Sequence, residues 1–236
     1  MYPSIIRAHN LCYCSILPPP PAMPPSDVAY EQHGGQRFVK ADVIKGLVPE
    51  VVEHLGNCRS RAKAAYAAAT DPMVKRVNKA REMAFKICSN SIYGALGSSQ
   101  SMLPLMQIAA TVTAIGRNDI LTSKGIAERL FPDARVIYGD TDSIFIRFKV
   151  SDATNTQVAV TEAIEKAKVV AKAINEVMQA PKSIAFEKVY SVLLLLSKKR
   201  YGGILYSDSH KWGEEPPTEI KGMQVYLLPL CRYCLI

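Results

Sequence analysis

Apolar residues recur with helical spacing over much of the chain, and shorter alternating or continuous apolar runs occur mainly toward its second half. The helical spacing predicts helices over residues 49–66, 72–93, 108–129 and 161–178. The shorter runs predict strands over residues 184–196 and 200–206, and a β-hairpin from segments 135–138 and 144–146. No internal repeat is visible. The pattern therefore predicts an α+β chain.

Proline and glycine mark the breaks between these elements. Prolines cluster at positions 18–21, 24 and 25, which predicts an exposed loop through Gly35, whereas residues 2–17 resemble a buried segment. Asp71 and Pro72 suit the start of a helix, and Gly94 suits its end. The helices before and after Asp71 are joined by a short polar turn, so we expect an antiparallel pair. Residues 151–156 form a polar linker in this prediction.

Composition narrows the class of protein. The chain has 236 residues, of which 48% are hydrophobic and 21% charged, so it can bury a substantial core. A net charge of +8 suits a polyanionic partner. The longest apolar stretches, near residues 192–196 and 226–230, are too short to span a bilayer, and no secretory signal is visible. We therefore expect an intracellular protein with no membrane partner.

The six cysteines are scattered along the chain rather than spaced as a disulfide framework. A reduced, intracellular setting fits this usage. Cys231 and Cys234 have the spacing of half a zinc knuckle, but no second ligand pair follows them. We interpret that pair as incidental.

The segment Tyr138-Gly139-Asp140-Thr141-Asp142-Ser143 places two carboxylates one residue apart in the turn of the predicted hairpin. Mg²⁺ prefers a few carboxylate oxygens and leaves positions for water and substrate phosphate. The alternative is a solvated turn, because Asp and Gly are common turn residues.

The predicted helical pair carries a set of cations. Lys86 and Asn90 are four residues apart, as are Arg59 and Lys63 on the preceding helix, and Arg81 lies one to two turns before Lys86. In an antiparallel pair these side chains can converge on phosphate oxygens. The alternative is a solvated basic face. The otherwise apolar residues around Lys86 argue against that alternative.

Several motifs together resemble those of the family B DNA polymerases, in the family's order and over residues 1 to about 225. Residues 86–94 resemble motif B (Lys, three residues, Asn-Ser, one residue, Tyr-Gly), and residues 138–143 resemble motif C. Residues 1–6 resemble the second half of motif A. Three further segments match the family: Phe186-Glu187-Lys188-Val189-Tyr190, Lys198-Lys199-Arg200-Tyr201 and Lys221-Gly222.

The resemblance implies two-metal nucleotidyl transfer, in which two divalent ions bracket the attacking 3′-hydroxyl and the leaving pyrophosphate. Asp142 and Asp140 would be ligands of two Mg²⁺ ions. Glu187 would add a third acidic group near the metals, and a surface ion pair is the alternative for that residue.

The resemblance also implies how nucleotide and DNA are bound. Lys86, Asn90, Arg59 and Lys63 would hold the triphosphate of the incoming dNTP, and Lys86 would also protonate the leaving pyrophosphate. Tyr2 would be the steric gate against a 2′-hydroxyl, with core packing as the alternative, and Tyr93 would help form the base-pair pocket. Primer–template backbone would be gripped by Lys198, Lys199, Arg200 and Tyr201, for which a solvated basic strand is the alternative.

In fold, the resemblance implies a right-hand polymerase palm, an antiparallel sheet with packed helices, plus fingers formed by a helical hairpin. The palm would comprise residues 1–45, with the Pro-rich loop, and 95–225, with the catalytic hairpin; the fingers would comprise 46–94. The exonuclease and thumb regions are absent from this pattern. The motif A Asp would precede residue 1, so we expect the chain alone to be inactive. Residues 226–236 depart from the family and form an aberrant or unassigned tail.

Residues 9–12 and 109–117 resemble the polymerase-delta-like enzymes of large DNA viruses, of the herpesvirus and phycodnavirus-like branch. This predicts action in the nucleus or at a viral replication site, with a processivity factor as a possible partner of the full-length protein. Two alternatives stay open: a non-catalytic nucleic-acid-binding remnant, and a reverse-transcriptase-like palm polymerase. Reverse transcriptases typically place two Asp residues side by side, whereas Thr141 separates Asp140 from Asp142.

Overall fold

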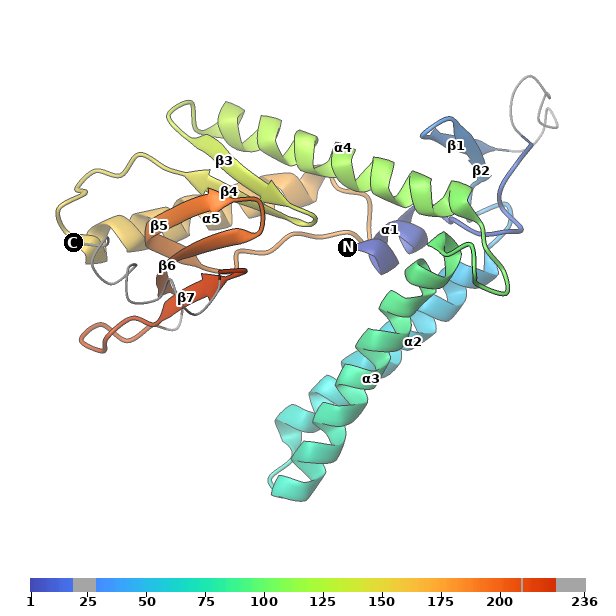
Figure 1. Ribbon diagram of the computed structural model, residues 1–236, viewed down its shortest axis with the longest axis horizontal. Helices are drawn as coiled ribbons and strands as arrows, with labels where there is room; N and C mark the ends of the chain where they lie inside the picture. Colours follow the sequence, from blue (N-terminus) through green and yellow to red (C-terminus); the bar gives the residue numbers. More distant parts are fainter. Residues whose placement is uncertain (19–28, 209, 224–236) are drawn as a thin grey trace. The chain divides into compact units, whose positions relative to one another are not determined.

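The computed structural model describes residues 1–18, 29–208 and 210–223 (Figure 1). The helices in these ranges are α1 (Tyr2–Ala8), α2 (Leu47–Ala68), α3 (Pro72–Gly97), α4 (Met106–Leu130) and α5 (Thr156–Val177). The strands are β1 (Tyr30–His33), β2 (Gln36–Val39), β3 (Arg135–Asp140), β4 (Ser143–Arg147), β5 (Val189–Ser197), β6 (Arg200–Tyr206) and β7 (Thr218–Lys221). The predicted mixture of helices with small antiparallel sheets is confirmed. The predicted tail, 226–236, lies outside the described residues.

The chain divides into two compact units. One comprises residues 1–119 with 179–182, and the other comprises 120–178 with 183–236. Helix α4 contributes residues to both units. No described helix has the length and apolar content needed to cross a membrane.

The core of the first unit forms around α1 and the beginning of α4. Ile5 and Ile6 of α1 are fully buried, as predicted for this segment. Burial of a side chain of this size contributes about 1.5–3 kcal/mol. The other buried members of the cluster are Leu11, Phe38, Val52, Leu96, Ile108, Val112 and Ile115. The core therefore joins α1, β2 and the ends of the long helices.

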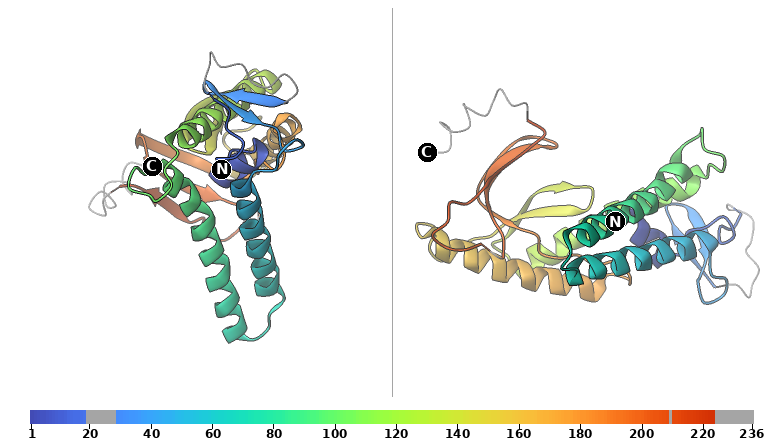
Figure 2. Two further views of the ribbon diagram at one scale, coloured as in Figure 1. Left: turned by 90° about the vertical axis from the view of Figure 1, so that its right-hand side faces the viewer. Right: turned by 90° about the horizontal axis from the view of Figure 1, so that it is seen from below.

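Helices α2 and α3 form the predicted antiparallel pair and lie side by side in every view (Figure 2). Pro72 occupies the first turn of α3, and the side chain of Asp71 accepts a hydrogen bond from the Met73 amide at 2.7 Å. This is the cap that the sequence predicts. The helix continues past Gly94 to Gly97, so the predicted end was three residues early.

The predicted loop through Gly35 was wrong over its last part, where β1 and β2 form a hairpin. His33 pairs with Gln36 across a two-residue turn made by Gly34 and Gly35. The φ angles of these glycines are +54° and +82°, the left-handed values that a type I′ turn requires at both positions. Phe38 on β2 is fully buried and anchors the hairpin to the core.

The second unit has its own core, in which α5 contributes Val170 and Ile174. Helix α5 begins at Thr156, within the predicted polar linker, because the Asn155 side chain accepts hydrogen bonds from the amides of residues 157 and 158 at 3.1 and 3.3 Å. The predicted strand over 184–196 begins only at Val189. The Asn175 side chain donates a hydrogen bond to the Ile184 carbonyl and accepts one from the Ile184 amide, each at 2.8 Å. Neither backbone group of Ile184 is therefore available for strand pairing.

Candidate active site

The two-carboxylate segment forms the predicted hairpin between β3 and β4. Asp140 pairs with Ser143, which leaves Thr141 and Asp142 as the turn. Thr141 has a φ of +53°, in the region that primed hairpin turns require at their first turn residue. A β-branched residue in this region stores strain of about 1–3 kcal/mol. The strained turn fixes the positions from which the two Asp side chains project.

Asp140 is held in its ionised form. Lys199 places its Nζ 3.0 Å from the carboxylate, and the Thr141 hydroxyl donates to the same oxygen at 3.0 Å. The hydrogen bond from Lys199 is the main cause that lowers the pKa of Asp140, and partial burial opposes it. Asp142 is exposed at the turn. An ionised carboxylate beside an exposed one is a donor set suited to a hard divalent cation.

Lys199, the cation that contacts Asp140, lies in the tight turn between β5 and β6. Ser197 pairs with Arg200 between β5 and β6, so Lys198 and Lys199 form the turn. Lys199 has a φ of +63°, again in the left-handed region. Lys198, Lys199 and Arg200 are all exposed. The predicted DNA-binding residues therefore lie together at one hairpin end.

Polar and aromatic contacts join the two hairpins within the second unit. The Lys199 amide donates to the Tyr138 hydroxyl at 2.9 Å. The ring of Phe145 lies 5.3 Å from that of Tyr201 and stacks at 6.2 Å on that of Tyr190. Such aromatic pairs each add about 0.5–1.5 kcal/mol beyond their buried area. The turn that carries Asp140 and Asp142 is thus held next to the basic turn by packing between the two hairpins as well as by charge.

Glu187, the third predicted acidic ligand, lies outside the β3–β4 hairpin that carries Asp140 and Asp142. Glu187 has a side chain that is 78% exposed, and its carboxylate lies 3.7 Å from Lys188. Among the described residues, Asp140, Asp142 and Glu187 do not gather their carboxylate oxygens within 4.8 Å of one another. The role of Glu187 stays a prediction that this arrangement does not favour.

A half-buried ion network around Glu219 of β7 was not predicted from the sequence. Glu219 accepts hydrogen bonds from Lys188 at 2.6 Å and from the Tyr190 hydroxyl, and Lys221 lies 3.1 Å away. Burial alone would raise the pKa of Glu219, but these hydrogen bonds hold it at about 2. No strand was predicted over Thr218–Lys221. The network ties β5 to β7 beside the basic turn.

Lys86 and Asn90 lie on α3, where both are exposed. The apolar neighbours of Lys86 do not cover it, because Met83 and Ile87 are themselves 49% and 58% exposed. A pair of helices has too narrow an interface to cover every apolar side chain that its sequence carries. The spacing of Lys86 and Asn90 on one helical face is as predicted.

Not all the cations of α2 and α3 are directed toward a common phosphate-binding surface. Arg59 on α2 reaches α3, but it does so to contact Glu82 at 3.3 Å, where Lys79 also binds at 2.9 Å. Lys63 and Arg81 are exposed. Glu82 therefore neutralises part of the surface that was expected to present cations to phosphate.

Tyr2 and Tyr93, which are far apart in the sequence, come together in the first unit. Their ring centroids are 4.0 Å apart at an interplanar angle of 23°, which is a stacked pair. Both rings pack against the core cluster. Burial is the main cause that raises the pKa of Tyr93. The predicted steric gate and base-pair pocket residue are thus direct neighbours.

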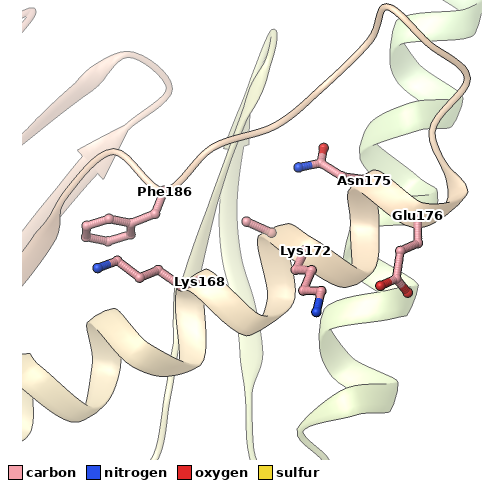
Figure 3. A pocket seen from close by; sticks show the side chains of 6 residues that line it. Lys168, Lys172, Asn175, Glu176 and Phe186 are labelled. Carbon is pink, nitrogen blue, oxygen red and sulfur yellow. The ribbon is translucent and has the colours of Figure 1, made fainter.

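A hollow of about 440 Å³ lies elsewhere, beside α5 (Figure 3). The Lys168 amine points toward the Phe186 ring in this hollow, and the Glu176 carboxylate points away from that ring (Figure 3). Its lining contains none of the predicted metal, nucleotide or DNA ligands. We therefore do not assign the chemistry to it.

Comparison with known proteins agrees with the motifs. The model of DNA polymerase family B matches residues 1–233. The chain is 39% identical over 235 residues to the DNA polymerase delta catalytic subunit of Oryza sativa subsp. japonica, covering 95% of this chain and 20% of that protein. It is 40% identical over 223 residues to the same subunit of Bos taurus, covering 89% of this chain and 20% of that protein.

A solved structure is similar as well. The family B DNA polymerase of Pyrobaculum calidifontis superposes with a TM-score of 0.64 at 28% identity, covering 94% of this chain and 26% of that one. The chain spans about a fifth of the length of the curated relatives named above. Those relatives are eukaryotic replicative subunits, so they do not support the expected origin in a large DNA virus.

Proposed function

Because the chain belongs to the family B DNA polymerases, we propose that it is the part of a DNA-directed DNA polymerase that carries the catalytic hairpin. The reaction is addition of deoxynucleotides to a primer 3′ end during DNA replication. The observation that carries this proposal is the hairpin itself. It presents Asp140, held ionised, and exposed Asp142 next to a basic turn.

The donor set at the hairpin fits two Mg²⁺ ions, because it offers hard carboxylate oxygens with room for water and phosphate. Asp140 and Asp142 would hold these ions. Bound there, the ions would neutralise charge on the reacting phosphate and lower the pKa of the primer 3′-hydroxyl. Lys199 lies 3.0 Å from Oδ1 of Asp140, so a metal ion that binds this oxygen would displace the Lys199 amine. This amine then becomes available to a DNA phosphate.

The first unit would supply the nucleotide contacts. Exposed Lys86 and Asn90 on α3 would meet the triphosphate, together with Arg59 and Lys63 of α2. In this proposal α2 and α3 are the fingers, within residues 46–94, and residues 1–45 and 95–225 form the palm.

The stack of Tyr2 on Tyr93 supports a sugar-selecting role. A ring held by a neighbour 4.0 Å away cannot easily give way to an added 2′-hydroxyl. Discrimination against ribonucleotides therefore follows from rigidity of the pair as well as from its bulk.

The basic turn would contact the primer–template duplex. Phosphate contacts from Lys198, Lys199 and Arg200 are indifferent to base sequence, as copying of arbitrary templates requires. Partners in this proposal are primer–template DNA and dNTPs, and a processivity factor in the complete polymerase. By analogy with the eukaryotic relatives, the site of action is the nucleus.

The test is Asp142→Asn in the complete polymerase. Metal stabilisation worth several kcal/mol would be lost, so we expect primer extension with Mg²⁺ and four dNTPs to fall about a hundredfold or more. DNA binding, measured by fluorescence anisotropy, should be nearly unchanged. Asp133→Asn, at an exposed residue before β3, is the matched control and should extend normally.

Extension that survives in the Asp142→Asn variant would disprove the metal assignment. Extension on an RNA template but not on DNA would instead favour a reverse-transcriptase-like enzyme.

A further inference from the structure

Three side chains outside the catalytic hairpin gather their ligand atoms at one point. The Nδ1 of His9 lies 3.2 Å from Oε2 of Glu31, and the Nε2 of His33 lies 3.1 Å from the same oxygen. One ligand atom from each residue lies within 4.8 Å of the other two. Within the described part of the chain, this is the one group of three or more such residues that meets this distance.

Local structure brings these residues together. Glu31 and His33 are two positions apart on β1, so their side chains share one face of the hairpin. The Gly34-Gly35 turn and the buried Phe38 fix the hairpin against the first unit's core. His9 is the C-cap residue of α1. The cluster therefore joins two elements that are far apart in sequence.

The spacing matches a metal site. A tetrahedral Zn²⁺ with bonds of about 2.0–2.1 Å separates its ligand atoms by roughly 3.3–3.4 Å. The separations of the two ring nitrogens from Oε2 of Glu31, 3.2 and 3.1 Å, are close to that value. Binding would need only small movements of the side chains.

His9 contributes a buried ring whose Nδ1 faces Glu31. The residue is only 8% exposed, and its second ring nitrogen, Nε2, is buried without a hydrogen-bond partner among the described residues. Nδ1 is therefore the ring nitrogen of His9 that is placed to bind a metal.

A nearby cation does not oppose the site. Lys182 is close enough to lower the pKa of His9. Its amine, however, lies 2.9 and 3.0 Å from the two carboxylate oxygens of Asp119, which offset its charge.

We propose that His9, Glu31 and His33 form a binding site for a divalent transition-metal ion, best matched by Zn²⁺, which clamps the β1–β2 hairpin to the end of α1. Two imidazoles with one carboxylate suit Zn²⁺, whereas Mg²⁺ prefers oxygen ligands alone. The fourth position is left to water. The site is separate in residues and in ligand chemistry from the pair of carboxylates proposed to hold Mg²⁺.

The test is titration of the metal-stripped 236-residue chain with Co²⁺, followed by competition with Zn²⁺. We expect the visible absorption of four-coordinate Co²⁺ with nitrogen and oxygen ligands, and its loss when Zn²⁺ is added. His33→Ala and Glu31→Gln should each weaken binding at least about tenfold, by removal of one ligand. Gln32→Ala is the matched control, because this exposed residue alternates to the other face of β1.

Far-UV circular dichroism identifies which variants retain the fold, and the comparison uses those variants. A chain with Asp142→Asn should bind Zn²⁺ as tightly as the parent, which separates this site from the proposed polymerase metals. Absence of the visible band, equal affinity in the His33, Glu31 and Gln32 variants, or a thiolate-to-metal band as the sole signal would each overturn the proposal.

Discussion

At the scale of single residues, the main feature is the contact of Lys199 with Asp140. Two left-handed turn residues, Thr141 and Lys199, direct these side chains toward each other across a separation of 3.0 Å. The cation thus occupies a place beside a carboxylate that we assign to metal binding. The charge of Asp140 is therefore paired with that of Lys199 in the absence of metal or DNA.

Removal of the amine should change the titration of the carboxylate. Lys199 lowers the pKa of Asp140, so in Lys199→Ala the pKa should rise toward its usual value of 3.8. An NMR titration of the side-chain carboxyl carbon measures this directly. Lys198→Ala removes a neighbouring charge from the same turn and should leave the pKa nearly unchanged. Equal shifts in both variants would show that general charge, and not this contact, sets the pKa.

The contacts between side chains were the part of the site that could not be predicted from the sequence. The carboxylates of Asp140 and Asp142 were recognisable from their spacing, because a motif and a tight turn are local. The contacts of Arg59 with Glu82 and of Tyr2 with Tyr93 depend on which faces of distant segments meet. Sequence periodicity does not specify that.

At the scale of elements, short-range chemistry decides where helices and hairpins begin. The capping residues Asp71 and Asn155 each accept backbone amides at a helix start, and only the first of them was predicted. The hairpin of β1 and β2 was missed because its strands are short and mostly polar. Its Gly34-Gly35 turn was nevertheless a readable signal of type I′ geometry.

Loss of the α3 cap should destabilise the helical pair. In Asp71→Ala the amide of Met73 loses its acceptor, so the free energy of unfolding should fall by about 1 kcal/mol. Urea denaturation followed by far-UV circular dichroism gives this value. Asp71→Asn keeps an equally good cap and should differ little from the parent. If the Ala and Asn variants prove equally stable, solvent satisfies this amide as well as the carboxylate does.

At the scale of the whole molecule, the chain is two units with separate cores. The positions of the long helices and of the β3–β4 hairpin followed from apolar periodicity. The division into two units did not, because α4 is one uninterrupted helix that contributes to both. Nor did β7, whose four residues, Thr218–Lys221, are too few for a periodic signal.

The second unit should be the more sensitive to acid. Glu219 has a pKa of about 2 in the folded chain against an ordinary value of 4.5, so its ionised form stabilises the fold above about pH 4.5. That contribution should be lost progressively as the pH falls from about 4.5 toward 2. Glu219→Gln should therefore lower the free energy of unfolding by roughly 1–3 kcal/mol at pH 7, and by progressively less in acid.

The fluorescence of Trp212, the single tryptophan of the chain, reports on the unit that contains Glu219. Glu187→Gln changes a 78% exposed neighbour and should alter stability by less than about 0.5 kcal/mol. A pH-independent loss in the Glu219 variant would point to packing rather than to charge.

The pair formed by α2 and α3 has a consequence for motion. Its helices contain 22 and 26 residues, which corresponds to about 33 and 39 Å of length. Val52 and Leu96 of the core cluster lie at one end of the pair, whereas the turn at Asp71, at the other end, is exposed. Local opening should therefore cost least free energy at that turn and most at the end that lies in the core. Because the pair is long and is held in the core at one end, a small rotation of the helices near Val52 would displace Asp71 by a much larger distance.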